Sequence, residues 1–316
     1  MPAKHYYGDV LEDADDKLKY DEDKPWKVED VKLLTFKVKS AINGFNVSQA
    51  LDMVKGKTGG QDIKHKCEVR HTPKCMKEHA FKLTTSSSSF KGEWEFSPKD
   101  LNTDGKHASV EVEGDYVYGK NEWEGKAEFK LGGFKLGPIS PWNEVQFNTN
   151  HKQEHQLTIS QNLIYEQYHA AWRTLLDVNG KKMTDAYGIL ALKNSSGDFY
   201  LRSNCLQRLV SLGWFTKWCD NGFHCYEVQY DFKGANRGIM DLPLFARFGW
   251  HYHLNNGSTL SSQLFAGNKW WWTSKWDLPI TKQIKVTVQD QADVLAAFQN
   301  PKDVNYNVGV HFEFKL

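Results

Sequence analysis

Histidine and cysteine side chains gather in one stretch of the chain that could hold a metal ion. The stretch HKCEVRHTPKC contains His65, Cys67, His71 and Cys75. Imidazole and thiolate are ligands that zinc prefers, but structural zinc sites usually show regular spacings such as Cys-x-x-Cys. Here the spacing is irregular, and only His65 and Cys67 need share one face of a strand. We therefore predict an ordinary hairpin and no metal site, with zinc binding as the alternative.

Two other stretches combine residue types that could bind a ligand. Cys219, His224 and Cys225 form a weaker cluster, which we expect to lie in a loop. The run Trp270 to Trp272 could stack a flat ligand. The end of a strand at a membrane interface explains this run more simply, because Trp is enriched at that depth.

Catalytic signatures are absent from the sequence. It contains no GxSxG, no HExxH and no Walker-type phosphate-binding loop. We predict no catalytic residues, no enzyme activity and no cofactor.

Composition argues against several classes of protein. The 316 residues include 40 basic and 39 acidic side chains, which gives a net charge of +1 and no reason to expect a nucleic-acid partner. No run of about 18 apolar residues occurs, so we predict no transmembrane helix. The five cysteines show no Cys-x-x-Cys spacing, which favours a reducing environment. The first residues are acidic and lack an apolar stretch, so we expect no cleaved targeting segment.

The elements that must position these side chains are β-strands, because apolar and polar residues alternate along most of the chain. In the C-terminal NVGVHFEFKL, Val308, Val310 and Phe312 point to one face and polar residues to the other. The same alternation recurs in CYEVQYDFKG, ITKQIKVTVQD, KAEFKL and LLTFKVKS, with Asn-Gly and Asp-Gly turn signals between such segments. Helical periodicity is confined to residues 6–20 and, weakly, to YEQYHAAWRTLL, which reads equally well as a strand.

Evenly spaced strands with short turns predict a large up-and-down sheet. After about 25 N-terminal residues, about 15 residues for each strand and turn give about 19 strands. Closure into a barrel would remove the exposed edges of so large a sheet. We predict a transmembrane antiparallel β-barrel of about 19 strands at residues 26–316, preceded by an acidic segment with a short helix at residues 1–25. A soluble β-propeller or pair of sandwiches is the alternative, although no propeller-like repeat is visible.

The C-terminal strand also carries the pattern polar-x-Gly-x-x-hydrophobic-x-hydrophobic, formed by Asn307, Gly309, Phe312 and Phe314. This pattern resembles the sorting signal of mitochondrial outer-membrane β-barrels. The layout of YYGDVLEDADDKLKYD followed by the strand VKLLTFKVKS is similar to that of mitochondrial porins, the voltage-dependent anion channel family. The last third of the chain, from FGWHYH to HFEFKL, resembles the final porin strands in order and spacing.

The resemblance implies a channel in the mitochondrial outer membrane. Ions and small metabolites such as phosphate and adenine nucleotides would diffuse through it passively, with voltage gating by the N-terminal segment. It also implies contact with membrane lipid, small anionic metabolites in transit, and association with further copies or with other mitochondrial membrane proteins.

The sequence departs from the porin pattern at several positions. Asn255 and Gln263 stand where the family has an acidic and a basic residue. The segment GGFKLG, which contains Lys135, is only a partial match to the nucleotide-contacting Gly-Leu-Lys element of the family. The N-terminal segment is acidic, whereas the family helix is more basic. An acidic N-terminus would suit basic presequences, so a protein-translocating or purely structural outer-membrane barrel is the alternative function.

In a barrel, the polar face of the strands would line the lumen. Alternation assigns equal numbers of basic and acidic side chains to this face, which predicts weak ion selectivity. For any single residue, pairing across strands to stabilise the wall is the alternative role. The predicted lumen residues are Lys37, Lys39, Lys82, Lys130, Arg202, Lys233, Lys285, Lys315, Glu93, Glu95, Glu111, Glu113, Glu128, Glu227, Asp231 and Glu313.

Overall fold

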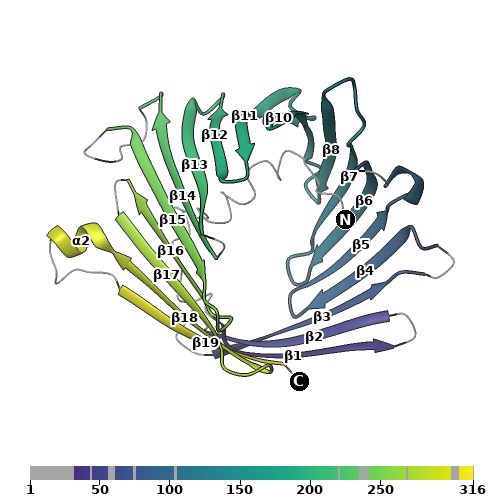
Figure 1. Cartoon of the computed structure of the whole chain (residues 1–316). Coiled ribbons are helices and arrows are strands. Elements are labelled where there is room, and N and C mark those ends of the chain that lie inside the picture. The colour runs from purple at the N-terminus through teal and green to yellow at the C-terminus, as the bar shows by residue number, and fades with distance from the viewer. Residues whose placement is uncertain are drawn as a thin grey trace.

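The chain forms a single β-sheet of nineteen strands (Figure 1). The computed structural model describes residues 32–42, 45–55, 61–73, 76–102, 105–219, 221–234, 239, 242–267, 270–299 and 306–315. The predicted all-β class and the strand number are confirmed, whereas closure into a barrel and insertion into a membrane stay predictions. The predicted N-terminal helix lies outside the described residues.

The strands follow one another in chain order and are 8 to 13 residues long. They are β1 (Lys32–Ile42), β2 (Phe45–Lys55), β3 (Gln61–His71), β4 (His79–Ser86), β5 (Ser89–Phe96), β6 (His107–Val117), β7 (Glu122–Gly132), β8 (Ser140–Asn150), β9 (His155–Tyr165), β10 (Tyr168–Asp177), β11 (Lys182–Asn194), β12 (Gly197–Asn204), β13 (Leu209–Cys219), β14 (Gly222–Asp231), β15 (Leu244–His253), β16 (Thr259–Ala266), β17 (Trp270–Pro279), β18 (Ile284–Asp293) and β19 (Tyr306–Lys315). A 3₁₀ turn, η3 (Lys99–Leu101), and a short helix, α2 (Val294–Gln299), interrupt the series.

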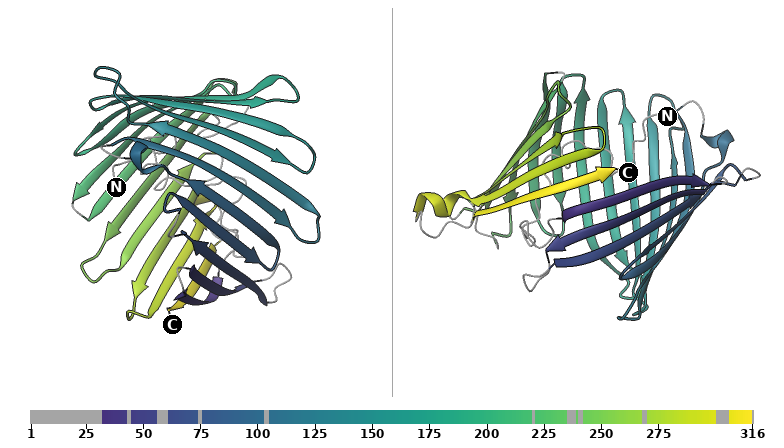
Figure 2. Two further views of the ribbon diagram at one scale, coloured as in Figure 1. Left: turned by 90° about the vertical axis from the view of Figure 1, so that its right-hand side faces the viewer. Right: turned by 90° about the horizontal axis from the view of Figure 1, so that it is seen from below.

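Consecutive strands pair antiparallel, and β1 also pairs with β19. That last pair is parallel, with Leu34 opposite Phe312 and Lys37 opposite Lys315. It departs from the predicted antiparallel arrangement because the first and last of an odd number of alternating strands run in the same direction. Figures 1 and 2 show the sheet curving around a central space, with β1 and β19 side by side.

Tight turns set the register of the hairpins. Glu166 adopts a φ of 53° between β9 and β10, and Lys181 adopts a φ of 48° between β10 and β11. In the second turn, the Gly180 amide donates to Asp177 Oδ1 at 2.9 Å, as an Asx-type turn requires. Because the turn at Glu166 cuts YEQYHAAWRTLL near its start, the remainder of that ambiguous segment is strand β10.

The helix α2, which alternation alone does not predict, follows the last residue of β18. Asp293 Oδ1 accepts a hydrogen bond from the Ala296 amide at 3.0 Å and thereby satisfies one of the free N–H groups of the first turn. None of the helices within the described residues is long and apolar enough to cross a membrane.

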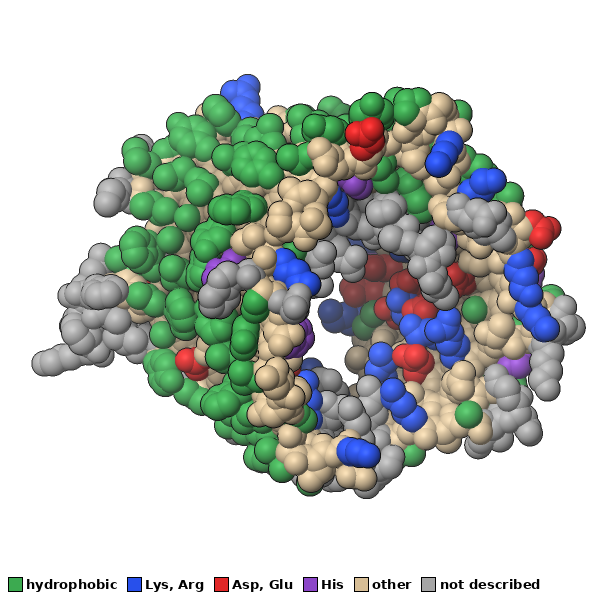
Figure 3. Space-filling view, viewed as in Figure 1, with side chains coloured by type: hydrophobic (Ala, Val, Ile, Leu, Met, Phe, Trp, Pro, Cys, Tyr) green, Lys and Arg blue, Asp and Glu red, His purple; other side chains and the backbone are tan. Residues whose placement is uncertain are grey.

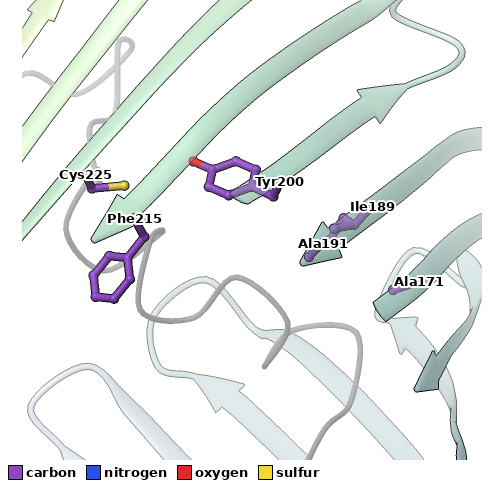
Figure 4. Close-up of a cluster of buried hydrophobic side chains, with 6 residues drawn as sticks. All are labelled: Ala171, Ile189, Ala191, Tyr200, Phe215 and Cys225. Atoms are coloured by element: carbon purple, nitrogen blue, oxygen red, sulfur yellow. The ribbon is translucent and has the colours of Figure 1, made fainter. Parts of the chain in front are cut away.

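The two faces of the sheet differ in exposure. On β19, the apolar side chains of Val308, Val310 and Phe312 are 50%, 38% and 41% exposed, so no core formed by the described residues covers them. The principal cluster of buried apolar side chains lies instead on strands β10 to β14, on the opposite face of the sheet (Figure 4). The described part of the sheet therefore has an uncovered apolar outer surface.

Candidate functional site on the charged inner wall

Charged side chains line the inner face of the curved sheet. On β6, Val112 and Tyr116 are exposed on the outer face, whereas Glu111, Glu113 and Asp115 alternate with them. Figure 3 shows Lys, Arg, Asp and Glu side chains gathered in the central opening and hydrophobic side chains over much of the outer surface. The inner wall is thus the face where fixed charge is concentrated.

On β4 to β6, lysines separate carboxylates that lie directly opposite each other. Glu93 on β5 pairs in register with Glu113 on β6. Lys91 Nζ lies 3.0 Å from Glu93 Oε1 and 2.7 Å from Glu113 Oε1. Lys82 on β4 adds a contact of 2.9 Å to Glu93. Since like charges directly opposite destabilise a sheet, these two lysines offset the repulsion between the carboxylates.

The same arrangement recurs on β6 and β7. Glu111 lies opposite Glu128, whose side chain is buried. Lys126 and Lys130 each place Nζ 2.8 Å from a Glu128 oxygen. Lys130 also lies opposite Glu144 of β8 in the strand register. Charges of both signs therefore alternate across the wall from β4 to β8.

A second network centres on the fully buried carboxylate of Glu227 on β14. Arg202 Nη2 donates to Glu227 Oε2 at 2.5 Å, and Arg247 Nη1 lies 3.9 Å from Oε1. The hydroxyl of Tyr200 donates to Oε2 at 3.1 Å. One carboxylate thus holds two guanidinium groups and a phenol, which come from the two strands β12 and β15.

Gly213 makes this network possible. In the register, Gly213 on β13 lies between Tyr200 on β12 and Glu227 on β14. A Cβ atom at Gly213 would lie 2.0 Å from Tyr200 Cζ. The ring of Tyr200 therefore passes over the backbone of β13 and reaches Glu227 only because residue 213 has no side chain.

An apolar patch adjoins the Glu227 network on the same face. Tyr200, Phe215 and Cys225 belong to a buried cluster that extends to Ile189 and neighbouring alanines (Figure 4). Phe215 stacks on Phe223, with ring centroids 5.6 Å apart. The inner face is consequently charged over β4 to β8 and partly apolar over β10 to β14.

A third group of charges lies on β17 and β18. Asp277 Oδ2 is 3.3 Å from Lys275 Nζ and 3.1 Å from Lys285 Nζ. The hydroxyl of Thr287, which is buried, donates to Asp277 Oδ1 at 2.6 Å. This cluster on β17 and β18 therefore contains two basic groups and one acidic group.

A polar hollow of about 680 Å³ opens at the end of the sheet that carries the β8–β9 and β10–β11 turns. Its walls hold more carboxylates than lysines, so its local potential is negative. The charged residues that line it are Glu113, Asp115, Glu124, Glu154, Asp177, Lys126 and Lys182.

Most of the predicted lumen residues that are described lie on the inner face. They are Lys82, Lys130, Arg202, Lys285, Glu93, Glu95, Glu111, Glu113, Glu128, Glu227 and Asp231. Lys39 lies on β1 and is exposed. The side chains of Lys37, Lys315 and Glu313 lie outside what the structure describes, as do those of Asn307 and Phe314 in the predicted sorting signal.

Two predicted positions do not belong to the strand wall. Lys233 follows the end of β14 and lies in a turn, where its amide donates to Asp231 Oδ1 at 2.8 Å. The alternation rule was therefore wrong for Lys233, because it was extended past the last paired residue. Lys135 lies exposed in the loop between β7 and β8.

Several charged residues of the wall were missed by the sequence reasoning. Lys91, Lys126, Arg247 and Asp277 all form ion pairs on the inner face. Lys91 and Lys126 could have been found, because each precedes a predicted inner-face glutamate by two residues along its strand. Arg247 carries no such signal, since apolar residues flank it on both faces of its strand.

The first metal candidate does not form a cluster in the described structure. His65, Cys67 and His71 lie on the same face of β3 but are spread along it, and His71 stacks on Phe45 with ring centroids 4.1 Å apart. Cys75 lies outside the described residues. Among the residues that are described, no group of three or more His, Cys, Asp or Glu side chains is arranged to hold a metal ion.

The second cluster was wrongly expected in a loop. Cys219 ends β13, and His224 and Cys225 belong to β14. Since His224 and Cys225 are adjacent in one strand, they point to opposite faces. The three consecutive Trp residues begin β17, which confirms the predicted strand end. Their place at a membrane interface stays a prediction.

The fold and the inner wall define an all-β protein with an uncovered apolar outside and a charged inside. A scan against protein-family models found no match, and a search of curated proteins found no similar sequence. Membership of the mitochondrial porin family therefore remains a prediction made from the two ends of the chain.

Proposed function

We propose that the protein is a membrane pore whose sheet closes into a β-barrel and lets ions and small metabolites diffuse across the outer mitochondrial membrane. The observation that supports this proposal most strongly is the apolar outer surface, which no other part of the described chain covers. The mitochondrial location and the metabolite class, phosphate and adenine nucleotides, rest on the resemblance of the chain ends to porins.

The outer surface argues for lipid because its apolar side chains are large, exposed and repeated from strand to strand. Phe129, Leu190, Leu212, Trp214 and Val308 come from four strands, β7, β11, β13 and β19, and are 46% to 59% exposed. Water in contact with so continuous an apolar surface costs free energy in proportion to its area. A hydrocarbon environment removes that cost, which is why transmembrane strands alternate apolar outside and polar inside.

The pairing and the strand lengths support the same proposal. Backbone N–H and C=O groups at an open sheet edge cannot be satisfied in lipid, so a membrane sheet must close. Four residues of β1 pair with β19, and closure of the barrel would extend this pairing along the two strands that would otherwise be edges. Strands of 8 to 13 residues suit a tilted strand that crosses the hydrocarbon layer.

The inner wall argues for a water-filled lumen. Lys82, Lys91, Lys126 and Lys130 keep between 26% and 32% of their side-chain surface exposed while they contact carboxylates. Charges in a dry interior would carry a desolvation cost of several kcal/mol each, whereas a wet wall leaves their outer sides hydrated. Because basic and acidic groups alternate in pairs, we expect weak selectivity, with the acidic hollow attracting cations locally.

The acidic hollow is the observation that favours the second candidate, a protein-translocating barrel. Five carboxylates against two lysines would attract a basic polypeptide segment at that end of the sheet. A purely structural barrel is the further alternative, and it would need no open lumen.

Single-channel recording in a planar bilayer with a salt gradient tests the proposal. We expect a stable conductance with a reversal potential close to zero. Insertion without conductance would refute the pore and favour a structural barrel. A conductance that basic peptides block, but acidic peptides of the same length do not, would favour translocation.

A further inference from the structure

We propose that His251 and His253 form a binding site for a divalent transition-metal ion at one end of the inner wall. The two residues are separated by Tyr252 near the end of β15, in the sequence HYH. They lie on the same face of the strand as Arg247, which joins the Glu227 network. The site is therefore part of the inner wall and does not face the apolar outside.

The two imidazoles converge instead of pointing straight out from the strand. Their Nε2 atoms are 3.1 Å apart, and the ring centroids are 4.5 Å apart with the ring planes 73° from parallel. A metal ion at about 2.0–2.1 Å from both Nε2 atoms would subtend an N–metal–N angle of roughly 100° at this separation. That angle lies between the square-planar and tetrahedral values, so both rings can bind one ion without moving apart.

The backbone holds this geometry in place. The His253 amide donates to the Asn221 carbonyl at 2.7 Å, across the turn that joins β13 and β14. His251 is paired in register with Phe223 of β14 and with Ser261 of β16. Because both residues lie on a strand paired on both sides, little ordering is needed when an ion binds.

Neutral imidazole nitrogens select the class of ion. They suit Zn²⁺, Ni²⁺ and Cu²⁺ and bind Mg²⁺ or Ca²⁺ poorly. Within the described residues, no third His, Cys, Asp or Glu completes the group. Water would fill the other coordination positions, as expected for an exchangeable ion and not for a structural one. On binding, each neutral ring keeps its proton on Nδ1 and offers the Nε2 lone pair to the metal.

The alternative account of the contact is a simple hydrogen bond in which the two Nε2 atoms share one proton. It predicts the same short distance but no metal affinity. This inference does not depend on the pore proposal, since metal binding is measured without any conductance. In a conducting pore, the bound ion would add positive charge at the end of the lumen opposite the acidic hollow.

Isothermal titration of tag-free protein in detergent with Ni²⁺ separates these accounts. Nickel is chosen over copper because copper ions oxidise free thiols, and the described chain has several. We expect one bound ion, and a loss of affinity of at least about tenfold in His251→Ala and in His253→Ala. His224→Ala is the matched control, because His224 lies nearby on β14 but on the outer face, where it contacts Tyr226 and Phe248.

Two results would overturn the proposal. One is an affinity that stays unchanged in His251→Ala and His253→Ala, or that falls equally in the His224→Ala control. The other is wild-type protein that binds no nickel. If an alanine variant fails to fold, His251→Gln and His253→Gln keep the size of the side chain and must show the same loss. Displacement of nickel by Zn²⁺ at the same stoichiometry would extend the site to zinc.

Discussion

Replacement of Glu227 by Gln is expected to destabilise the protein by about 2–3 kcal/mol. Removal of one partner from a buried ion pair typically costs about 3–5 kcal/mol, because the opposite charge is left uncompensated. Here Arg202 and Arg247 retain 23% and 24% of their side-chain exposure, so water offsets part of the loss. The amide of Gln also still accepts one hydrogen bond, which lowers the cost further.

The matched control is Glu113→Gln. Glu113 also contacts a basic side chain, but its own side chain is 24% exposed and Glu93 lies directly opposite. Loss of its charge removes one contact with Lys91 and one repulsion, so a change of about 1 kcal/mol or less is expected. Guanidinium unfolding in detergent micelles, followed by Trp fluorescence, measures both variants. Equal unfolding midpoints for the two variants would refute the reasoning from burial.

The same substitution has an electrical consequence for the proposed pore. Glu227→Gln removes one negative charge from beside Arg202 and Arg247 on the inner wall. The reversal potential in a salt gradient should therefore shift toward anion preference. A shift toward cation preference would contradict this expectation. The absence of any shift in a variant that still conducts would mean that the ions do not pass near Glu227.

Two further substitutions test the inner packing and the outer surface. Gly213→Ala should cost about 1–3 kcal/mol in the same unfolding assay, because the new Cβ meets the ring of Tyr200; Gly114→Ala, where nothing lies within 4 Å, should be close to neutral. Leu212→Arg, on the outer face of β13, should reduce insertion into lipid vesicles by about 2–4 kcal/mol. Leu101→Arg is its control, since Leu101 is also exposed but lies in η3, outside the strands. Normal insertion of Leu212→Arg, or equal losses for both arginine variants, would argue against lipid contact on this face.

Alternation along the chain predicts most of the fold because a strand has a period of two residues. It identifies the exposed face of Val308, Val310 and Phe312 and the inner positions of Glu111 and Glu113 correctly. It fails where both faces are apolar, as around Arg247, or where a strand ends earlier than the pattern, as at Lys233. Strand ends depend on the turn, which a periodic pattern does not encode.

Contacts across strands were beyond the reach of sequence reasoning. That Glu93 lies opposite Glu113, with Lys91 between them, depends on the register of β5 and β6 and not on the content of either segment. The role of Gly213 likewise follows only from its position between Tyr200 and Glu227. A strand sequence specifies the face of each residue, whereas neighbours are specified by turn length and hydrogen bonding.

The parallel pairing of β1 with β19 has a consequence for how the chain folds. Every other strand pair joins neighbours in sequence, and such hairpins form quickly because the loop to be closed is short. The β1–β19 pair joins residues from almost opposite ends of the chain and includes four registered positions, against ten between β1 and β2. We expect it to form last and to open first. In hydrogen-exchange measurements, the amides that join β1 to β19 should therefore lose protection before those in the middle of the sheet.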